Sequence, residues 1–224
     1  MLLTVTAVDA ASGGFVAPFA TPKLEWDFKI PRVVSINASG HKFGLTYVGV
    51  GWVIWRSAKH LPKDLIFEFH YLGSVDYSFS LNFSRPAHPI IAQYFNFLHL
   101  GFQGYRDVAL TGLRNARTLS RALEKTGFFT VLSDIHRPVG GARYTSTISD
   151  RPLDGDDVEV YSRSDDHGMH LLTWLQLYEP GLPVVAFRLS DESQQKHPGI
   201  RQKWIQTLLR TKGWCVAVLM GYGG

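Results

Sequence analysis

The sequence predicts an α/β fold: most of it belongs to a domain built on a parallel sheet, followed by part of a smaller α/β domain. A nearly continuous apolar run over residues 2–8 ends at Asp9 and is followed by a glycine-containing loop, which is typical of a buried parallel strand. Short segments rich in β-branched and aromatic residues come next, and a long segment with helical spacing starts at Pro86. A chain of 224 residues can form one core, or one domain and part of another.

The expected elements follow from apolar spacing and from the turn residues between the segments. Residues 1–126 are expected to form the C-terminal part of the larger domain, and residues 127–224 part of the smaller one. We expect strands at 2–8, 32–37, 51–55 and 65–71, a loop at 38–42, a helix from Pro86 to about Thr126 that Gly101 and Gly104 bend or interrupt, strands at 128–132 and 183–187, a helix at 199–212 and a last strand at 214–219.

Residues 137–168 differ from the rest of the chain. They are rich in Arg, Asp, Ser and Gly and show no sustained apolar period, which predicts a disordered insertion in the smaller domain. Asp154, Asp156 and Asp157 match the spacing of no standard calcium loop, so they are interpreted as part of a solvated linker. No metal site is predicted.

Composition and charge exclude several classes of function. The net charge is +4, but Lys and Arg are interleaved with Asp and Glu, without the basic stripe that a nucleic acid requires. The basic row Arg114, Arg117, Arg121 and Lys125 in the predicted helix is interpreted as a solvated face. Mean hydropathy near zero argues against a polytopic membrane protein, and the single Cys215 is consistent with a reducing cytoplasm.

An acidic residue and a lysine occupy positions that suggest chemistry. Asp9 is expected at the carboxyl end of the first strand, and Lys42 lies in the loop after the second strand, in Ser39-Gly40-His41-Lys42. Ligands of open α/β sheets bind at this edge. Pyridoxal phosphate requires a lysine to hold its aldehyde as an imine and a carboxylate beside its pyridine nitrogen, and Lys42 and Asp9 suit these roles. Ser39 and His41 could donate hydrogen bonds to its phosphate.

Five stretches of the sequence carry distinctive motifs: residues 8–15 (VDAASGGF), 26–28 (WDF), 35–44 (SINASGHKFG), 49–56 (GVGWVIWR) and 81–86 (LNFSRP). With these stretches the sequence resembles glutamate decarboxylases, within the group II pyridoxal-phosphate-dependent decarboxylases. The similarity covers residues 8 to about 133 and resumes over 180–212. Aromatic amino-acid decarboxylases share the aspartate and the His-Lys pair, but they are not similar through the tryptophan-rich strand.

The resemblance implies a fold-type I, aspartate aminotransferase-like enzyme that converts L-glutamate to 4-aminobutanoate and carbon dioxide. It implies that Lys42 holds pyridoxal phosphate and that Asp9 pairs with the pyridine nitrogen. Ser39 and His41 would contact the phosphate, and Phe83 and Ser84 would approach the phosphate of a neighbouring subunit. The expected protein is thus a cytoplasmic homo-oligomer with its active site at the dimer interface.

Some features depart from the family and leave alternatives open. Ala7 stands where the family usually has a histidine, and the regions that stack on the cofactor and recognise the substrate are not in this sequence. Both ends look cut, which predicts exposed sheet edges and a tendency to aggregate. The alternatives are a non-catalytic fragment, a dimerisation partner of a full-length decarboxylase, and another pyridoxal-phosphate lyase. Ser84 also suits the N-cap of the predicted helix.

Overall fold

The computed structural model describes residues 5–78, 84–137 and 178–214. The chain divides into two compact units, Met1–Thr111 (unit 1) and Gly112–Gly224 (unit 2). The domain boundary expected near residue 126 remains a prediction. All but the first residue of the expected strand at 214–219 and of the expected insertion at 137–168 lie outside the described residues, as do Asp154, Asp156 and Asp157.

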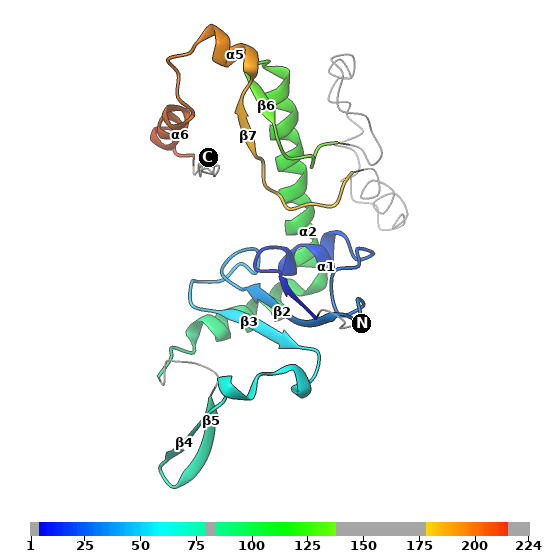
Figure 1. Ribbon diagram of the computed structural model, residues 1–224, viewed down its shortest axis with the longest axis vertical. Helices are drawn as coiled ribbons and strands as arrows, with labels where there is room; N and C mark the ends of the chain where they lie inside the picture. The colour runs from blue at the N-terminus through cyan, green and yellow to red at the C-terminus, as the bar shows by residue number, and fades with distance from the viewer. Residues whose placement is uncertain (1–4, 79–83, 138–177, 215–224) are drawn as a thin grey trace. The chain divides into compact units, whose positions relative to one another are not determined.

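Unit 1 contains a three-stranded mixed sheet in the order β1-β2-β3 (Figure 1). Strands β1 (Thr6–Asp9) and β2 (Val33–Ser39) are parallel, and β3 (Gly51–Trp55) is antiparallel to β2. These strands confirm three of the expected ones. The first is not fully buried, however: Ala7 and Asp9 are exposed, because β1 pairs with β2 alone among the described strands.

A small core beside the sheet is formed by residues of β2 and of the segment between β1 and β2. Ala10, Val33 and Ile36 are buried, and Trp26 and Phe28 pack against them. Trp26 is therefore the packing residue that its type predicts. The remaining short elements of unit 1 before the hairpin are the 3₁₀ turns η1 (Gly13–Phe15), η2 (Ala58–His60) and η3 (Lys63–Leu65) and the helix α1 (Ala17–Ala20).

A hairpin follows in which one strand was expected and the other was missed. Strands β4 (Phe67–Tyr71) and β5 (Ser74–Ser78) pair through a two-residue turn formed by Leu72 and Gly73. Both turn residues have positive φ, 52° and 85°, as hairpin turns of this length require. Gly73 was the available signal for the turn, but an exposed leucine in this conformation is uncommon.

The helix α2 (His88–Lys125) confirms the long helix expected from the sequence (Figure 1). It is interrupted at Gly101, which has φ 57° and ψ −167°, as the glycine predicted. Because α2 begins at His88, Ser84 lies too far upstream to serve as its N-cap, and that alternative for Ser84 is wrong.

Within the described residues, unit 2 contains the rest of α2, the antiparallel strands β6 (Phe129–Val131) and β7 (Phe187–Leu189), and the helices α5 (Asp191–Lys196) and α6 (Gln202–Thr211). Strand β7 begins four residues later than the strand expected at 183. Helix α5 was missed, although the Ser190 hydroxyl caps it by accepting a hydrogen bond from the Ser193 amide.

The basic row of α2 forms only part of the solvated face expected of it: Lys125 is exposed, but Arg117 and Arg121 are engaged in contacts. Arg117 is 4% exposed, its Nε donates to the Ile135 carbonyl at 2.9 Å, and its guanidinium lies 4.2 Å from the centre of the Tyr178 ring. Arg121 also donates to the Tyr178 hydroxyl. These arginines therefore hold the segments around residues 135 and 178 against the helix.

Candidate functional site

The candidate site lies where β1 and β2 end side by side. Asp9 is the last residue of β1 and is paired with Asn37 of β2. Since the two strands are parallel, their carboxyl ends meet at one edge of the sheet. The structure thus confirms the expected position of Asp9 at the end of a strand, next to the segment that leads to Lys42.

The turn after β1 is tied to the end of β2. The Ala10 amide donates to the Asn37 carbonyl at 3.0 Å, and the Ser39 amide donates to the Ala11 carbonyl at 3.1 Å. A Cβ atom on Gly14 would lie 2.9 Å from the Cβ of Ala38, so this turn fits against β2 only with glycine there. These contacts fix the Asp9 backbone relative to Ser39.

The Asp9 carboxylate is held by two hydrogen bonds to one oxygen. The Ala11 amide and the Asn37 Nδ2 both donate to Oδ1 at 3.0 Å. The bond from the Ala11 amide has the largest effect on the pKa of Asp9. Together with the bond from Asn37 and the positive charge of Lys42, it lowers this pKa below its ordinary value. The group is therefore ionised at neutral pH. Within the described residues Oδ2 has no hydrogen-bond partner, so it can accept a bond from a ligand.

Ser39, His41 and Lys42 lie together at the end of β2 and in the following turn. Ser39 is half-buried, whereas His41 and Lys42 are exposed. His41 Nδ1 lies 3.4 Å from the Val50 carbonyl, a contact that is a hydrogen bond when Nδ1 carries the proton. The Lys42 amide donates to the Ser39 carbonyl at 3.3 Å, which turns the chain sharply after β2.

Two of the predicted site residues are not brought to this edge by the described structure. Ser84 is exposed, and no contact joins it to Asp9 or to residues 39–42 in the described part of unit 1. Phe83 lies outside the described residues. The expectation that both approach a neighbouring subunit remains a prediction.

Gln93 is a residue of this region that sequence reasoning missed. It lies on α2, is fully buried, and donates from Nε2 to the Gly44 carbonyl at 2.8 Å, two residues after Lys42. A lone glutamine inside a helix forms no motif. The only sequence signal of a buried side chain here was the pair of glycines around the lysine, Gly40 and Gly44, which leave room for the Gln93 amide.

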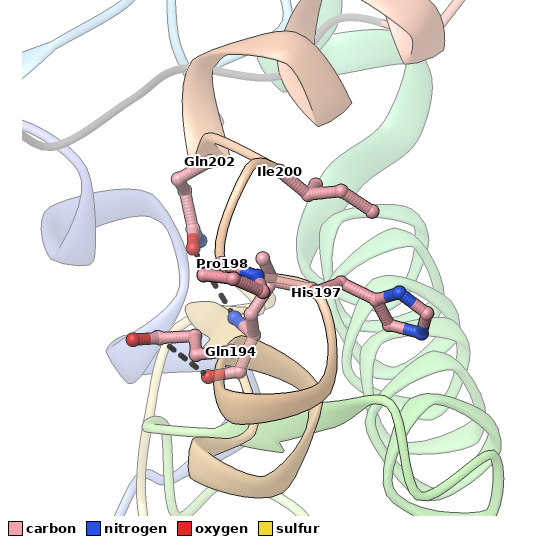
Figure 2. A pocket seen from close by; sticks show the side chains of 6 residues that line it. Gln194, His197, Pro198, Ile200 and Gln202 are labelled. Carbon is pink, nitrogen blue, oxygen red and sulfur yellow. Dashed lines mark hydrogen bonds between the residues drawn. The ribbon is translucent and has the colours of Figure 1, made fainter.

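The described surface of unit 2 contains a hollow of about 410 Å³ that none of the site residues line. Figure 2 shows the Gln202 and Gln194 side chains there, both hydrogen-bonded to the backbone of Leu189 at 3.1 and 3.2 Å. These side chains hold β7 against the helices after it, so we interpret the hollow as a feature of folding. No group of three or more His, Cys, Asp or Glu side chains in the described ranges could hold a metal ion, and no described helix is long and apolar enough to cross a membrane.

Comparison with known proteins agrees with this geometry. The family model described as "Pyridoxal-dependent decarboxylase conserved domain" matches residues 4–140. "Glutamate decarboxylase" of Solanum lycopersicum is 55% identical over 133 residues, which are 59% of this chain and 26% of the relative. "Glutamate decarboxylase 3" of Arabidopsis thaliana is 54% identical over 209 residues, which are 93% of this chain and 32% of the relative.

A solved structure extends the similarity to the fold. Glutamate decarboxylase of Lactobacillus brevis CGMCC 1306 matches with a TM-score of 0.55 and 50% identity, covering 59% of this chain and 30% of that one. The parallel strand ends and this match define the class: the fold is that of fold-type I pyridoxal-phosphate-dependent proteins. It belongs to the family of the pyridoxal-dependent decarboxylase conserved domain. The chain spans between about a quarter and a third of the length of these relatives.

The cofactor of this family is pyridoxal phosphate, and the residues at the strand ends fit it. An ionised carboxylate with a free oxygen suits a protonated pyridine nitrogen, and an exposed lysine amine suits an aldehyde. A hydroxyl and an imidazole next to the lysine can donate to a phosphate.

Proposed function

We propose that the protein is a carboxy-lyase that converts L-glutamate to 4-aminobutanoate and carbon dioxide. The observation that carries the proposal is the position of the ionised Asp9 at the end of β1, beside the β2 end that leads to Lys42. The substrate is taken from the relatives, which are named glutamate decarboxylases and are 54% and 55% identical to this chain.

Each site residue has a role that follows from its chemistry. Lys42 would hold the cofactor through its aldehyde, and Asp9 would accept a hydrogen bond from the pyridine nitrogen and keep it protonated. When bound, the cofactor supplies an electron sink for the pair of electrons left behind as the α-carboxylate departs. Ser39 and His41 donate to the phosphate.

We further propose that the protein works in the cytoplasm as a homo-oligomer, in which Phe83 and Ser84 reach the cofactor phosphate of a neighbouring subunit. An apolar stripe on α2 supports self-association. Its members follow the helical spacing of one face and are 60–68% exposed: Ile91, Tyr94, Phe95 and Leu98. A stripe of this kind is better suited to a protein partner than to water.

The test of the activity is the release of carbon dioxide from L-glutamate by the purified chain with pyridoxal phosphate. We expect release above that of a Lys42→Ala variant, while Lys59→Ala, which changes another exposed lysine, keeps the wild-type rate. The Solanum lycopersicum relative serves as the positive control. Release no greater than that of Lys42→Ala, with the control active, would contradict the proposal and leave a non-catalytic fragment or dimerisation partner. Turnover of another amino acid with glutamate inert would indicate a different lyase.

A further inference from the structure

The loop that carries Lys42 has a backbone conformation that needs support. Residues 40–46 turn the chain between β2 and β3, and Leu45 lies in the left-handed region with φ 63°. A branched residue rarely adopts this region, because its Cβ crowds the backbone. The bonds inside the loop are few and long: the Leu45 amide donates to the Lys42 carbonyl, and the Thr46 amide to the Gly40 carbonyl, both at 3.2 Å.

Helix α2 supplies the missing support through short hydrogen bonds. The Gln93 Nε2 donates to the Gly44 carbonyl at 2.8 Å and to the Tyr105 hydroxyl at 2.9 Å. The Tyr105 hydroxyl donates in turn to the Gly44 carbonyl at 2.9 Å. On the next helical turn, the Asn96 Nδ2 donates to the carbonyl of the strained Leu45 at 2.7 Å.

The Gln93 and Tyr105 side chains are shielded from water. Gln93 is 0% exposed and Tyr105 is 2% exposed. Burial raises the pKa of Tyr105 above its ordinary value, although its bond with Gln93 acts in the opposite direction, so the hydroxyl keeps the proton that it donates. Hydrogen bonds in such surroundings are strong, and removing one leaves a buried polar group without a partner.

The two glycines around the lysine make this arrangement possible. A Cβ on Gly40 would lie 2.3 Å from Gln93 Oε1, and a Cβ on Gly44 would lie 2.9 Å from the same atom. The Gln93 amide therefore rests against the backbone on both sides of the segment that contains Lys42. Any side chain at either glycine would displace it.

We propose that Gln93, together with Tyr105, is a positioning residue for Lys42: it fixes the turn at residues 40–44 so that the lysine stays at the end of β2 beside Asp9. This inference rests on the proposed role of Lys42 and extends it to a fully buried residue 51 positions away. A Gln93 that only filled space would be replaced without consequence by an apolar side chain of the same length.

The test replaces Gln93 with methionine, which keeps the length but removes both donors. We expect the amides of Leu45 and Thr46 to exchange with deuterium about tenfold faster or more, because the loop opens more often. The amides that pair β2 with β3 serve as the internal reference. Borohydride trapping of pyridoxal phosphate on Lys42 should fall by a similar factor. Gln103→Met is the matched control, since Gln103 lies on the same helix but bonds only to the exposed Asp107.

A second variant separates hydrogen-bond donation by residue 93 from the packing of its side chain. In Gln93→Glu the buried carboxyl is expected to have a raised pKa, and its protonated form can donate one bond as the amide does. Wild-type protein measured at the same pH is the reference. In Gln93→Glu, amide exchange in the loop and trapping of pyridoxal phosphate on Lys42 should therefore be close to wild type at low pH and should differ from it increasingly as the pH rises. Gln93→Met should show no such dependence. If Gln93→Met does not fold, Tyr105→Phe, which removes one hydroxyl, takes its place in the exchange measurement.

The outcomes distinguish this inference from the proposed function. Unchanged loop exchange in the Gln93 variants would overturn the inference, as would faster exchange with unchanged trapping on Lys42. Absence of trapping in the wild-type chain would overturn the proposed function instead. In that case the exchange result alone would decide whether Gln93 holds the turn.

Discussion

At the scale of single residues, the proposed chemistry depends on the charge of Asp9 and the access to Lys42. Asp9 is exposed, yet two hydrogen bonds to Oδ1 and the nearby lysine lower its pKa. A carboxylate held in this way points its second oxygen in a defined direction without being buried, which avoids the cost of desolvating the charge.

Removal of the Asn37 amide should raise the pKa of Asp9. In Asn37→Ala one of the two donors to Oδ1 is lost, so the charged form is stabilised less. A carbon-13 titration of the Asp9 carboxyl measures the change, and Asn115→Ala, an exposed position on α2, should leave this pKa unaltered. An Asp9 pKa that is the same in Asn37→Ala and wild type would contradict the account.

The same shift has a consequence for stability. The pKa of Asp9 in the folded protein lies below the unfolded value of about 3.9. The contribution of Asp9 to the free energy of unfolding is therefore present above that pH and is lost as the pH falls through the folded pKa. At acid pH, the free energy of unfolding of Asp9→Asn should therefore depend slightly less on pH than that of the wild type.

From the sequence, candidate site residues can be singled out where a motif exists, and the roles assigned to them remain predictions. Asp9, Ser39, His41 and Lys42 could be found because strand ends, glycines and a His-Lys pair lie within short stretches. Gln93 could not, since its partners Gly44 and Tyr105 lie 49 and 12 positions away and pair with it only after folding.

At the scale of elements, periodicity predicted what depends on local pattern. Strands β1, β2 and β3 and the helix α2 were expected from apolar spacing, and Gly101 marked the interruption of the helix. The basic row was misjudged, because the face of α2 that carries Arg117 is covered by segments around residues 135 and 178, whose contact with the helix no local pattern reveals. Strand β5 was missed because Leu72 is an unusual residue in a hairpin turn.

The turn between β2 and β3 should tolerate no side chain at position 40. In Gly40→Ala the new Cβ would lie 2.3 Å from Gln93 Oε1 and 2.7 Å from Val50 Cγ1, so we expect a loss of about 1 to 3 kcal/mol in the free energy of unfolding. Urea denaturation measures it. Gly199→Ala is the control, because a Cβ there meets nothing within 4 Å; an equal effect of both changes would refute the packing argument.

At the scale of the whole molecule, the described candidate-site residues belong to unit 1, whereas the described part of unit 2 contains the rest of α2, a strand pair and two short helices. The family could be predicted from the sequence, because five stretches carry its residues in register and the matched region, residues 4–140, includes them all. Whole-protein properties, including the oligomer, depend on surfaces that meet other chains, and sequence patterns show these only indirectly.

The apolar stripe on α2 should drive self-association. Replacing Ile91 and Leu98 with lysine, at positions 65% and 68% exposed, should lower the weight-average mass of the chain in sedimentation velocity, because a charge opposes burial of that face. A double variant with Gln103→Lys and Thr111→Lys adds the same charge at other exposed positions of α2. If both double variants sediment alike, the stripe is not the contact surface.

The central claim is that Lys42 forms the covalent bond to the cofactor. Its most direct test is borohydride reduction of the chain incubated with pyridoxal phosphate, followed by peptide mass mapping of wild type and Lys42→Ala. The account predicts a phosphopyridoxyl group on Lys42 alone, with no label in Lys42→Ala. Label spread over several lysines, or no label in the wild-type chain, would contradict it.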